Sequence, residues 1–202
     1  MAGLADQRIA SIGHVLARAF FDDPLTTYLL PDRDARARLL PWYFSALARY
    51  GLLFGEVRAT PEPLAGVAIW LPPGHEPTPD GIRQAGLHAA PAVVGAERWQ
   101  RFVRVIEHLQ ALRGREAPLP HWYLLVVGVD PARQRRGIGR WLLEPDLARS
   151  DAEGFPCYLE TFKQANVAYY ERLGFQLLIE AVEPSSGLPF WTLGRDPRRA
   201  RS

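Results

Sequence analysis

The stretch VGVDPARQRRGIGRWLL, residues 127–143, constrains the fold of this 202-residue chain more than any other. An apolar run typical of a β-strand passes into a turn rich in arginine and glycine, and a helical pattern follows. A turn of this kind leaves backbone N–H groups pointing outward at the positive end of the helix dipole, which is where anions bind. Gly137 and Gly139 would let a phosphate approach the backbone, because neither carries a Cβ. The stretch therefore predicts an α/β unit with an anion site.

The glycine spacing excludes two common phosphate-binding loops. A Walker loop has four residues between its glycines and then Gly-Lys-Ser/Thr, which does not match this stretch. The dinucleotide fingerprint requires a third glycine where this chain has Leu142. The pattern that remains is Q-x-x-G-x-G at residues 134–139, with Arg133, Arg135 and Arg136 adding positive charge. The glycines alone leave open a polar turn whose arginines point into solvent.

Hydrophobic periodicity divides the chain into helices and strands. We expect helices at 6–21, 34–50, 80–113, 138–150 and 167–173, with Pro41 splitting or kinking the second and Pro91 interrupting the third. We expect strands at 53–58, 65–71, 121–129, 157–161, 175–182 and 190–193, of which the unbroken apolar run 121–129 is typical of a strand buried on both faces. The order βαβαββ in the second half favours a mixed α/β sheet with helices on its faces. We expect one domain over residues 1–202, with a helical insert at 78–116 and a frayed basic tail at 195–202.

Composition narrows the class of protein. The net charge of +2 comes from nearly balanced totals, so we expect no nucleic-acid partner and no membrane partner. Cys157 is the only cysteine, which excludes an internal disulfide, and the histidines show no metal-ligand spacing, so we expect no metal. No apolar run reaches the length of a membrane span, and the N-terminus does not have the layout of a signal peptide. We expect a cytoplasmic globular protein, either a monomer or a homodimer.

Two motifs follow each other in the second half of the chain. The first is VGVDP at residues 127–131, which precedes Q-x-x-G-x-G. The second is Leu159-Glu160-Thr161, then Asn166, then YERLGF at residues 170–175. Together they resemble the motifs of the GCN5-related N-acetyltransferases (GNAT), and the wording YLET…NVAYYERLGF, with AIWLPPG upstream, is similar to the puromycin N-acetyltransferase branch. The motifs cover about a quarter of the chain, and its first half matches only loosely.

The resemblance implies a GNAT-like fold, in which helices flank a mixed and splayed β-sheet, and acetyl-CoA as the co-substrate. It also implies backbone contacts with the pantetheine arm, N–H groups around the pyrophosphate, and an amide near the thioester. These contacts would come from Val127, Gly128 and Val129, from Gln134, Arg135, Arg136, Gly137, Ile138, Gly139 and Arg140, and from Asn166. The chain departs from the family in having no predicted strand before its first helix.

The resemblance makes Tyr170 the general acid and Glu160 a candidate base that acts through water. An alkyl ammonium must lose a proton before it attacks a thioester, and a partly buried carboxylate at the end of a strand could take that proton. A phenol with a pKa of about 10 stays protonated at neutral pH and could donate to the departing thiolate. Both residues have a structural alternative, because Glu160 could simply pair with an arginine and Tyr170 could be a core aromatic.

For the acceptor site, the only signal is where candidate residues fall among the predicted elements. Asp22 and Asp23 follow the first helix in a predicted loop, where carboxylates would attract a cationic amine. Trp70, Trp122 and Tyr123 could wall an aromatic or lipophilic pocket, although strand residues of this type are as often core. We expect an enzyme, an acetyl-CoA-dependent N-acetyltransferase that acts on the amine of a small molecule by direct transfer in a ternary complex. The alternatives are a non-catalytic acyl-CoA sensor and a protein N-terminal or lysine acetyltransferase.

Overall fold

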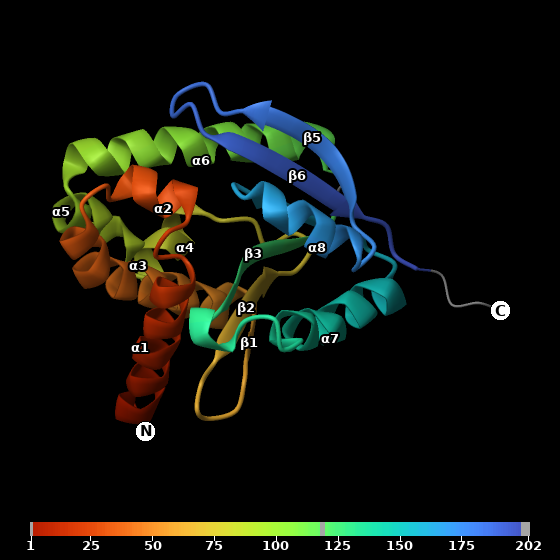
Figure 1. Cartoon of the computed structure of the whole chain (residues 1–202), viewed down its shortest axis with the longest axis horizontal. Coiled ribbons are helices and arrows are strands. Elements are labelled where there is room, and N and C mark those ends of the chain that lie inside the picture. Colours follow the sequence, from red (N-terminus) through yellow and green to blue (C-terminus); the bar gives the residue numbers. More distant parts are fainter. Residues whose placement is uncertain (1, 118–119, 199–202) are drawn as a thin grey trace.

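The computed structural model describes residues 2–117 and 120–198, and these residues form a mixed β-sheet with helices on both faces (Figure 1). The order of the sheet is β1-β2-β3-β4-β6-β5. Its strands are β1 (Glu56–Ala59), β2 (Gly66–Leu71), β3 (Trp122–Val129), β4 (Cys157–Thr161), β5 (Gln176–Val182) and β6 (Pro189–Arg195). β3 and β4 run parallel, and the other neighbouring pairs of this sheet are antiparallel. The predicted mixed α/β fold is confirmed.

The sheet parts in its middle. β3 and β4 pair only where Trp122 faces Cys157 and Tyr123 faces Tyr158, although both strands continue beyond these pairs. From Leu124 onward, the edge of β3 that faces β4 therefore has no strand partner for its backbone groups. The splayed sheet that the resemblance implied is present, and it opens toward the carboxyl ends of these two strands.

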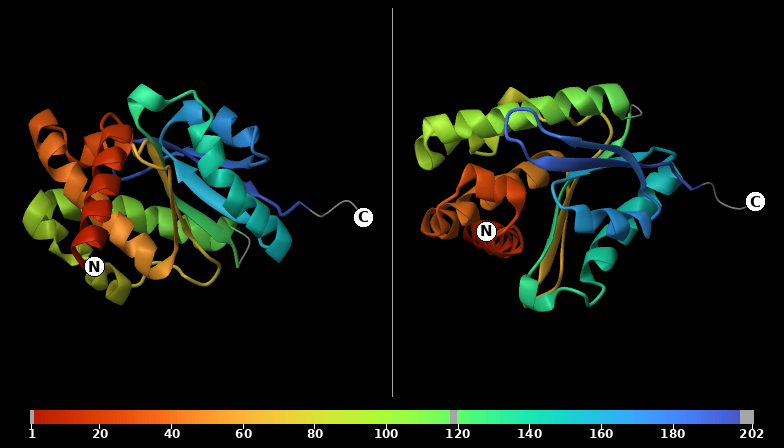
Figure 2. Two further views of the ribbon diagram at one scale, coloured as in Figure 1. Left: turned by 90° about the horizontal axis from the view of Figure 1, so that it is seen from below. Right: turned by 45° about the horizontal axis from the view of Figure 1, so that its top comes forward.

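Helices cover both faces of the sheet (Figure 2). They are α1 (Ala2–Ala19), α2 (Pro24–Leu29), α3 (Arg33–Phe54), α4 (Pro79–Gln84), α5 (Ala90–Val94), α6 (Ala96–Glu116), α7 (Ile138–Glu153) and α8 (Val167–Glu171). α1 and α3 pack on one face of β2 and β3, and α7 packs on the other. α6 covers one face of β5 and β6, and α8 lies on the opposite face. In the described part of the chain, none of these helices is long and apolar enough to cross a membrane.

Three local expectations need correction. α3 runs through Pro41, so this proline does not split the helix. The expected loop after α1 contains a helix, α2, because Asp23 caps it with a carboxylate that accepts the N–H of Leu25 at 3.0 Å and Pro24 occupies its first position. The expectation that residues 121–129 are buried on both faces holds only in part, since buried and half-buried residues alternate along β3 and residues 123–127 line a cavity.

The basic C-terminal segment is anchored where the sequence predicted a frayed tail. Arg195 is the last residue of β6, is 4% exposed, and donates to both carboxylate oxygens of Asp151 at 2.8 and 2.7 Å. The backbone N–H of Arg198 donates to the same carboxylate at 2.6 Å. The expectation is therefore wrong for residues 195–198, and residues 199–202 lie outside the described part of the chain.

Candidate active site

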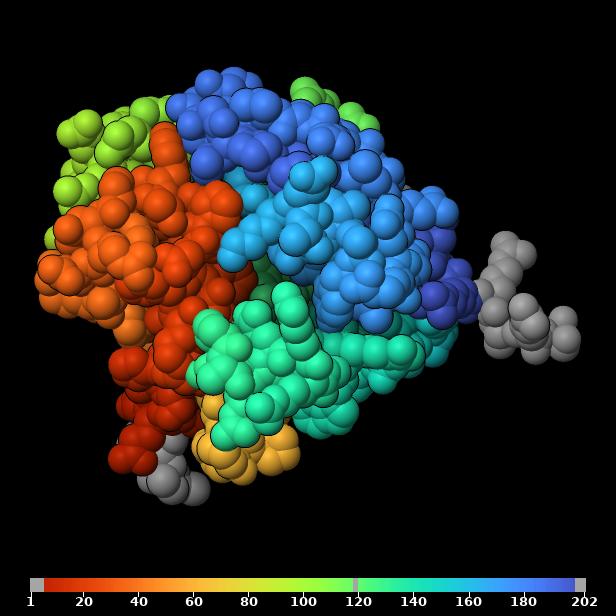
Figure 3. Space-filling view, viewed as in Figure 1, coloured from red at the N-terminus to blue at the C-terminus, as the bar shows by residue number. Residues whose placement is uncertain are grey.

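A cavity of about 530 Å³ extends from the gap between β3 and β4 into the helical layer. Residues of α2, α3, α4, α6, β3, β4 and α8 line the cavity. Figure 3 shows a hollow in the surface between α1 in red, the turn before α7 in teal and α8 in light blue. The cavity wall brings together four polar residues that the sequence singled out: Asp23, Glu160, Asn166 and Tyr170.

The end of the cavity that lies among the helices is aromatic. The ring centroid of Phe102 on α6 lies 5.1 Å from that of Trp99 and 5.9 Å from that of Tyr43 on α3. Ile106, one turn after Phe102, continues the same apolar wall. The segment 78–116, expected to be a helical insert, contains α4, α5 and α6, and residues of α6 line the cavity.

The turn between β3 and α7 presents its backbone to solvent. Residues 131–137 are exposed, and Arg135 and Gly137 have φ angles of 61° and 79°, in the left-handed region. No described side chain caps the N-terminus of α7, and a Cβ added at Gly137 would meet nothing within 4 Å. The first N–H groups of this 16-residue helix therefore face open space at the positive end of the helix dipole.

Other predicted cofactor residues have structural partners of their own. The side-chain amide of Gln134 donates to the carbonyl of Val129 at 3.1 Å and ties the turn to β3. Arg140 pairs with Glu144 at 2.6 Å on the surface of α7. The side-chain amide of Asn166 donates to the hydroxyl of Thr161 at 2.9 Å, and this bond fixes Asn166 on the cavity wall.

Tyr170 lies on α8, soon after β4, and lines the cavity. It is 6% exposed, and its ring centroid lies 5.7 Å from that of Phe175 in an edge-on contact. Burial raises the pKa of the Tyr170 phenol, and the neighbouring Tyr169 and Asp23 raise it further. Tyr170 is thus both a packed aromatic and a phenol that keeps its proton at neutral pH.

Glu160 lies at the carboxyl end of β4 with a buried side chain that lines the cavity. One of its oxygens lies 3.3 Å from Nη1 of Arg113, and the hydroxyl of Tyr123 lies close enough to the carboxylate to lower its pKa. Burial raises the pKa of Glu160, and the Arg113 charge and the Tyr123 hydrogen bond oppose the rise. Glu160 therefore forms the ion pair expected of a structural residue. It also faces the cavity, as a catalytic base must.

Arg113 is a site residue that the sequence analysis missed, and it contacts Tyr123, an aromatic candidate for a pocket wall that lines the cavity. The guanidinium of Arg113 stacks on the ring of Tyr123 at 3.9 Å and pairs with Glu160, 47 positions along the chain. A signal was present, because Arg113 falls on the apolar stripe of α6 that contains Phe102, Ile106 and Leu109. An arginine on such a stripe needs a buried partner.

The structure places the two acidic candidates for the acceptor site, Asp22 and Asp23, in different surroundings. Asp22 is exposed and pairs with Arg33 at 3.2 Å, so the expectation that it lines the acceptor pocket is wrong. Asp23 is buried and lines the cavity, with Oδ2 lying 3.5 Å from Nζ of Lys163. Burial raises the pKa of Asp23, and Lys163 opposes the rise.

The two tryptophan candidates are core residues. Trp70 is 0% exposed and Trp122 1% exposed, and both belong to the apolar core between the sheet and α7. The indole N–H of Trp122 donates to Glu153 at 3.0 Å. Neither side chain lines the cavity, so the expectation that they wall the acceptor pocket is wrong.

The model of the acetyltransferase (GNAT) family matches residues 17–175. The chain belongs to this family. It is 30% identical to an uncharacterised N-acetyltransferase of Schizosaccharomyces pombe over 193 residues, which cover 90% of this chain and 77% of the yeast protein.

Solved GNAT structures share the fold. A histone acetyltransferase HPA2-related protein of Corynebacterium glutamicum is similar with a TM-score of 0.64 and 24% identity, over 96% of this chain and 93% of that one. An agmatine N-acetyltransferase is similar with a TM-score of 0.57 and 15% identity, over 90% of each chain. At these identities the likeness concerns the fold alone.

This GNAT N-acetyltransferase belongs to a family that uses acetyl-CoA, and the chain has the features that such a molecule needs. The parted strands leave β3 backbone groups for an extended arm, and the uncapped turn at Gly137 is open to a diphosphate. The exposed Arg135 and Arg136 add positive charge to that turn. Among the described residues, no group of three or more His, Cys, Asp or Glu side chains is arranged to hold a metal ion.

Proposed function

We propose that this enzyme acetylates the amine of a small molecule by direct transfer, with both reactants bound at once. The observation that carries the proposal is the single cavity whose wall holds both Glu160 and Tyr170. A group that can accept a proton and a group that holds one thus face the same enclosed space. A non-catalytic acyl-CoA sensor would need neither group.

The residues that would hold acetyl-CoA follow the opening of the sheet. The backbone of β3 at residues 127–129 would bind the pantetheine arm, and residues 134–140 at the start of α7 would bind the diphosphate. Asn166 would lie near the thioester, because it shares the cavity wall with Tyr170. Bound there, acetyl-CoA supplies the acetyl group as an activated thioester.

Two side chains of the cavity wall would transfer the protons. Glu160 would take a proton from the ammonium through water, and the pKa that burial raises makes it a stronger base than an exposed carboxylate. Tyr170 would hold a proton at its Oη for the departing thiol. Much of the rate would come from holding the two reactants together in the cavity.

The shape of the cavity favours a small acceptor over a peptide. A peptide acceptor needs an open groove, whereas this cavity reaches into the helical layer, where Trp99 and Phe102 of α6 line it. The buried carboxylate of Asp23, on the same cavity wall, would attract a cationic amine. The resemblance to the puromycin branch makes that aromatic antibiotic one candidate acceptor.

Thiol release tests the function. The chain is incubated with acetyl-CoA and a panel of acceptors: puromycin, simple arylalkylamines, a polyamine, an aminoglycoside, a histone-tail peptide and an α-amino peptide. Fast release with at least one small amine, and slow release with both peptides, is the expected result. Thiol release with the peptides alone would show that the chain is a protein acetyltransferase. Binding of acetyl-CoA without thiol release for any acceptor would show that it is a sensor.

A further inference from the structure

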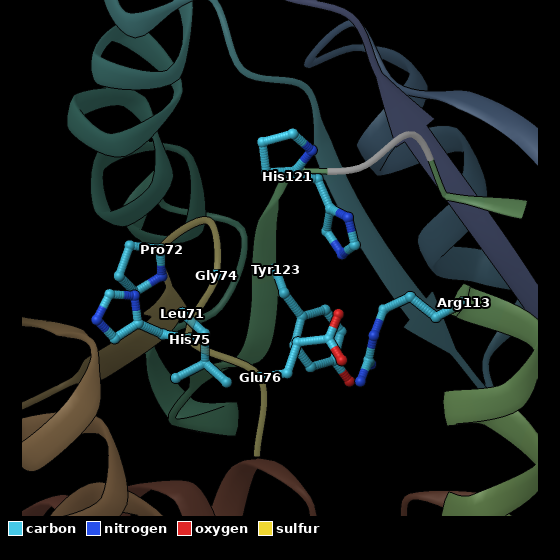
Figure 4. A pocket seen from close by; sticks show the side chains of 9 residues that line it. Leu71, Pro72, Gly74, His75, Glu76, Arg113, His121 and Tyr123 are labelled. Atoms are coloured by element: carbon cyan, nitrogen blue, oxygen red, sulfur yellow. The ribbon is translucent and has the colours of Figure 1, made fainter. Parts of the chain in front are cut away.

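A second pocket, of about 390 Å³, lies behind the wall of the main cavity. Figure 4 shows Glu76, Arg113 and His121 gathered around Tyr123 in this pocket. Gly74, His75 and Glu76 on its rim are exposed, so the pocket is open to water. Among the described residues, only Arg113 and Tyr123 line both the second pocket and the main cavity. These two side chains form the partition between the two spaces.

The proposed reaction needs an outlet for a proton. An alkyl ammonium is the main form of an amine at pH 7. As the N–C bond to the acetyl carbon forms and the C–S bond breaks, the nitrogen gives up two protons. One proton ends on the thiol, and the other must reach bulk water. Glu160 would receive it behind a cavity filled by both reactants, with Arg113 and Tyr123 as its hydrogen-bonding neighbours.

We infer that the Tyr123 hydroxyl carries this proton from Glu160 through the partition to water in the second pocket. This inference rests on the proposed function. The hydroxyl lies close enough to the Glu160 carboxylate to lower its pKa, and in the resting state it would donate to that carboxylate. Once Glu160 is protonated, the hydroxyl turns, accepts from the carboxyl group and donates to water on the other side. Tyr123 starts and ends neutral, so the step moves one proton and changes no other charge. Tyr123 acts only through Glu160 and is therefore a positioning residue.

Arg113 cannot take this role, because a guanidinium does not release its proton in proteins. It stacks on the Tyr123 ring at 3.9 Å and pairs with Glu160, so it holds both groups in place. The other titratable groups around Arg113 and Glu160 are the phenols of Tyr123 and Tyr158, the carboxylates of Glu76 and Glu116, and His121 beside Tyr158. Glu76 attracts Arg113 from the second pocket, and a proton leaving that way moves toward a carboxylate.

The test is Tyr123→Phe, which keeps the ring under Arg113 and removes the hydroxyl. The matched control is Tyr158→Phe, since Tyr158 pairs with Tyr123 across β3 and β4, is fully buried and lines neither space. We expect kcat of Tyr123→Phe to fall roughly 100-fold, the lower end of the range for a lost proton-transfer group, with KM for acetyl-CoA unchanged. We expect a small buffer base such as imidazole to restore turnover in this variant, because it can enter the second pocket, and to leave wild type and Tyr158→Phe unchanged.

Other outcomes separate the two proposals. Wild-type kcat in Tyr123→Phe, or a fall that no buffer base relieves, contradicts the relay while amine acetylation stands. A wild-type chain that acetylates no amine contradicts the proposed function and the relay with it. If Tyr123→Phe melts far below wild type, Tyr123→His takes its place, since imidazole can pass a proton. Turnover of Tyr123→His at or below one tenth of the wild-type kcat, without buffer rescue, also contradicts the relay.

Discussion

A Cβ added at Gly139 would lie 2.8 Å from the phenol oxygen of Tyr169, closer than carbon approaches oxygen in packed proteins. The Tyr169 oxygen is itself buried, without a hydrogen-bond partner among the described residues. Gly139→Ala must therefore displace Tyr169, and we expect it to lower the free energy of unfolding by roughly 1–3 kcal/mol, the usual cost of overpacking. Urea unfolding of the purified variant measures this loss.

The double variant identifies the cause of this loss. Tyr169→Phe removes the oxygen, and the next ring atom lies 3.5 Å from the added Cβ, an ordinary contact. We therefore expect Gly139→Ala to cost less in the Tyr169→Phe background than in the wild-type background. Equal costs in the two backgrounds would mean that the alanine acts on some other contact.

A substitution at Gly137 tests whether the turn before α7 binds the diphosphate. Gly137→Glu places a carboxylate in the open concavity at the start of α7, where we propose that the diphosphate binds. We expect calorimetry with acetyl-CoA to show at least a tenfold loss of affinity. Gly187→Glu is the matched control: Gly187 also has a positive φ, 71°, and open space around it, but lies in the turn between β5 and β6. If both variants bind acetyl-CoA like wild type, the diphosphate lies elsewhere.

Local signals explain what the sequence could predict. The apolar run, the glycine turn and the helical pattern at 127–143 each depend on neighbouring residues, so β3, the turn and α7 were predictable. Tyr170 and Glu160 came from the resemblance, and the structure places both on one cavity wall. The helix α2 was missed although the pair Asp23-Pro24 is a common helix start.

Long-range packing explains what the sequence could not. Arg113 meets Glu160 because α6 folds back over β4, and no short-range pattern fixes that crossing. Trp70 and Trp122 were candidates for a pocket wall because alternation along a strand does not say which face meets a helix. In the folded chain their face of the sheet is covered by α7, and both side chains are core.

Tyr170→Phe tests the general acid. The substitution keeps the edge-on contact with Phe175 and removes the proton that the phenol would donate. We expect kcat to fall roughly 100-fold, as for other lost general acids, while calorimetry gives a near-normal affinity for acetyl-CoA. Tyr158→Phe, which removes a buried phenol oxygen away from the cavity, should keep turnover near wild type. Unchanged turnover in Tyr170→Phe would remove Tyr170 from the mechanism.

The acidic limb of the pH–rate profile tests Glu160. A general base works only when deprotonated, and burial raises the pKa of Glu160 above its ordinary value of 4.5. We therefore expect kcat/KM to rise with pH through a limb that lies above 4.5. The charge of Arg113 opposes this rise of the pKa, so Arg113→Gln should move the limb to higher pH.

Arg115→Gln provides the control for that shift. It removes the same charge from the same helix, but Arg115 is exposed and lies outside the cavity wall, so the limb should stay in place. Tyr123 and Tyr158, the other titratable groups near Glu160, keep their protons in this range because burial raises the pKa of both phenols. A limb that Arg113→Gln leaves unmoved would belong to another group, and the base would then have to be sought elsewhere on the cavity wall, with Asp23 the next carboxylate to vary.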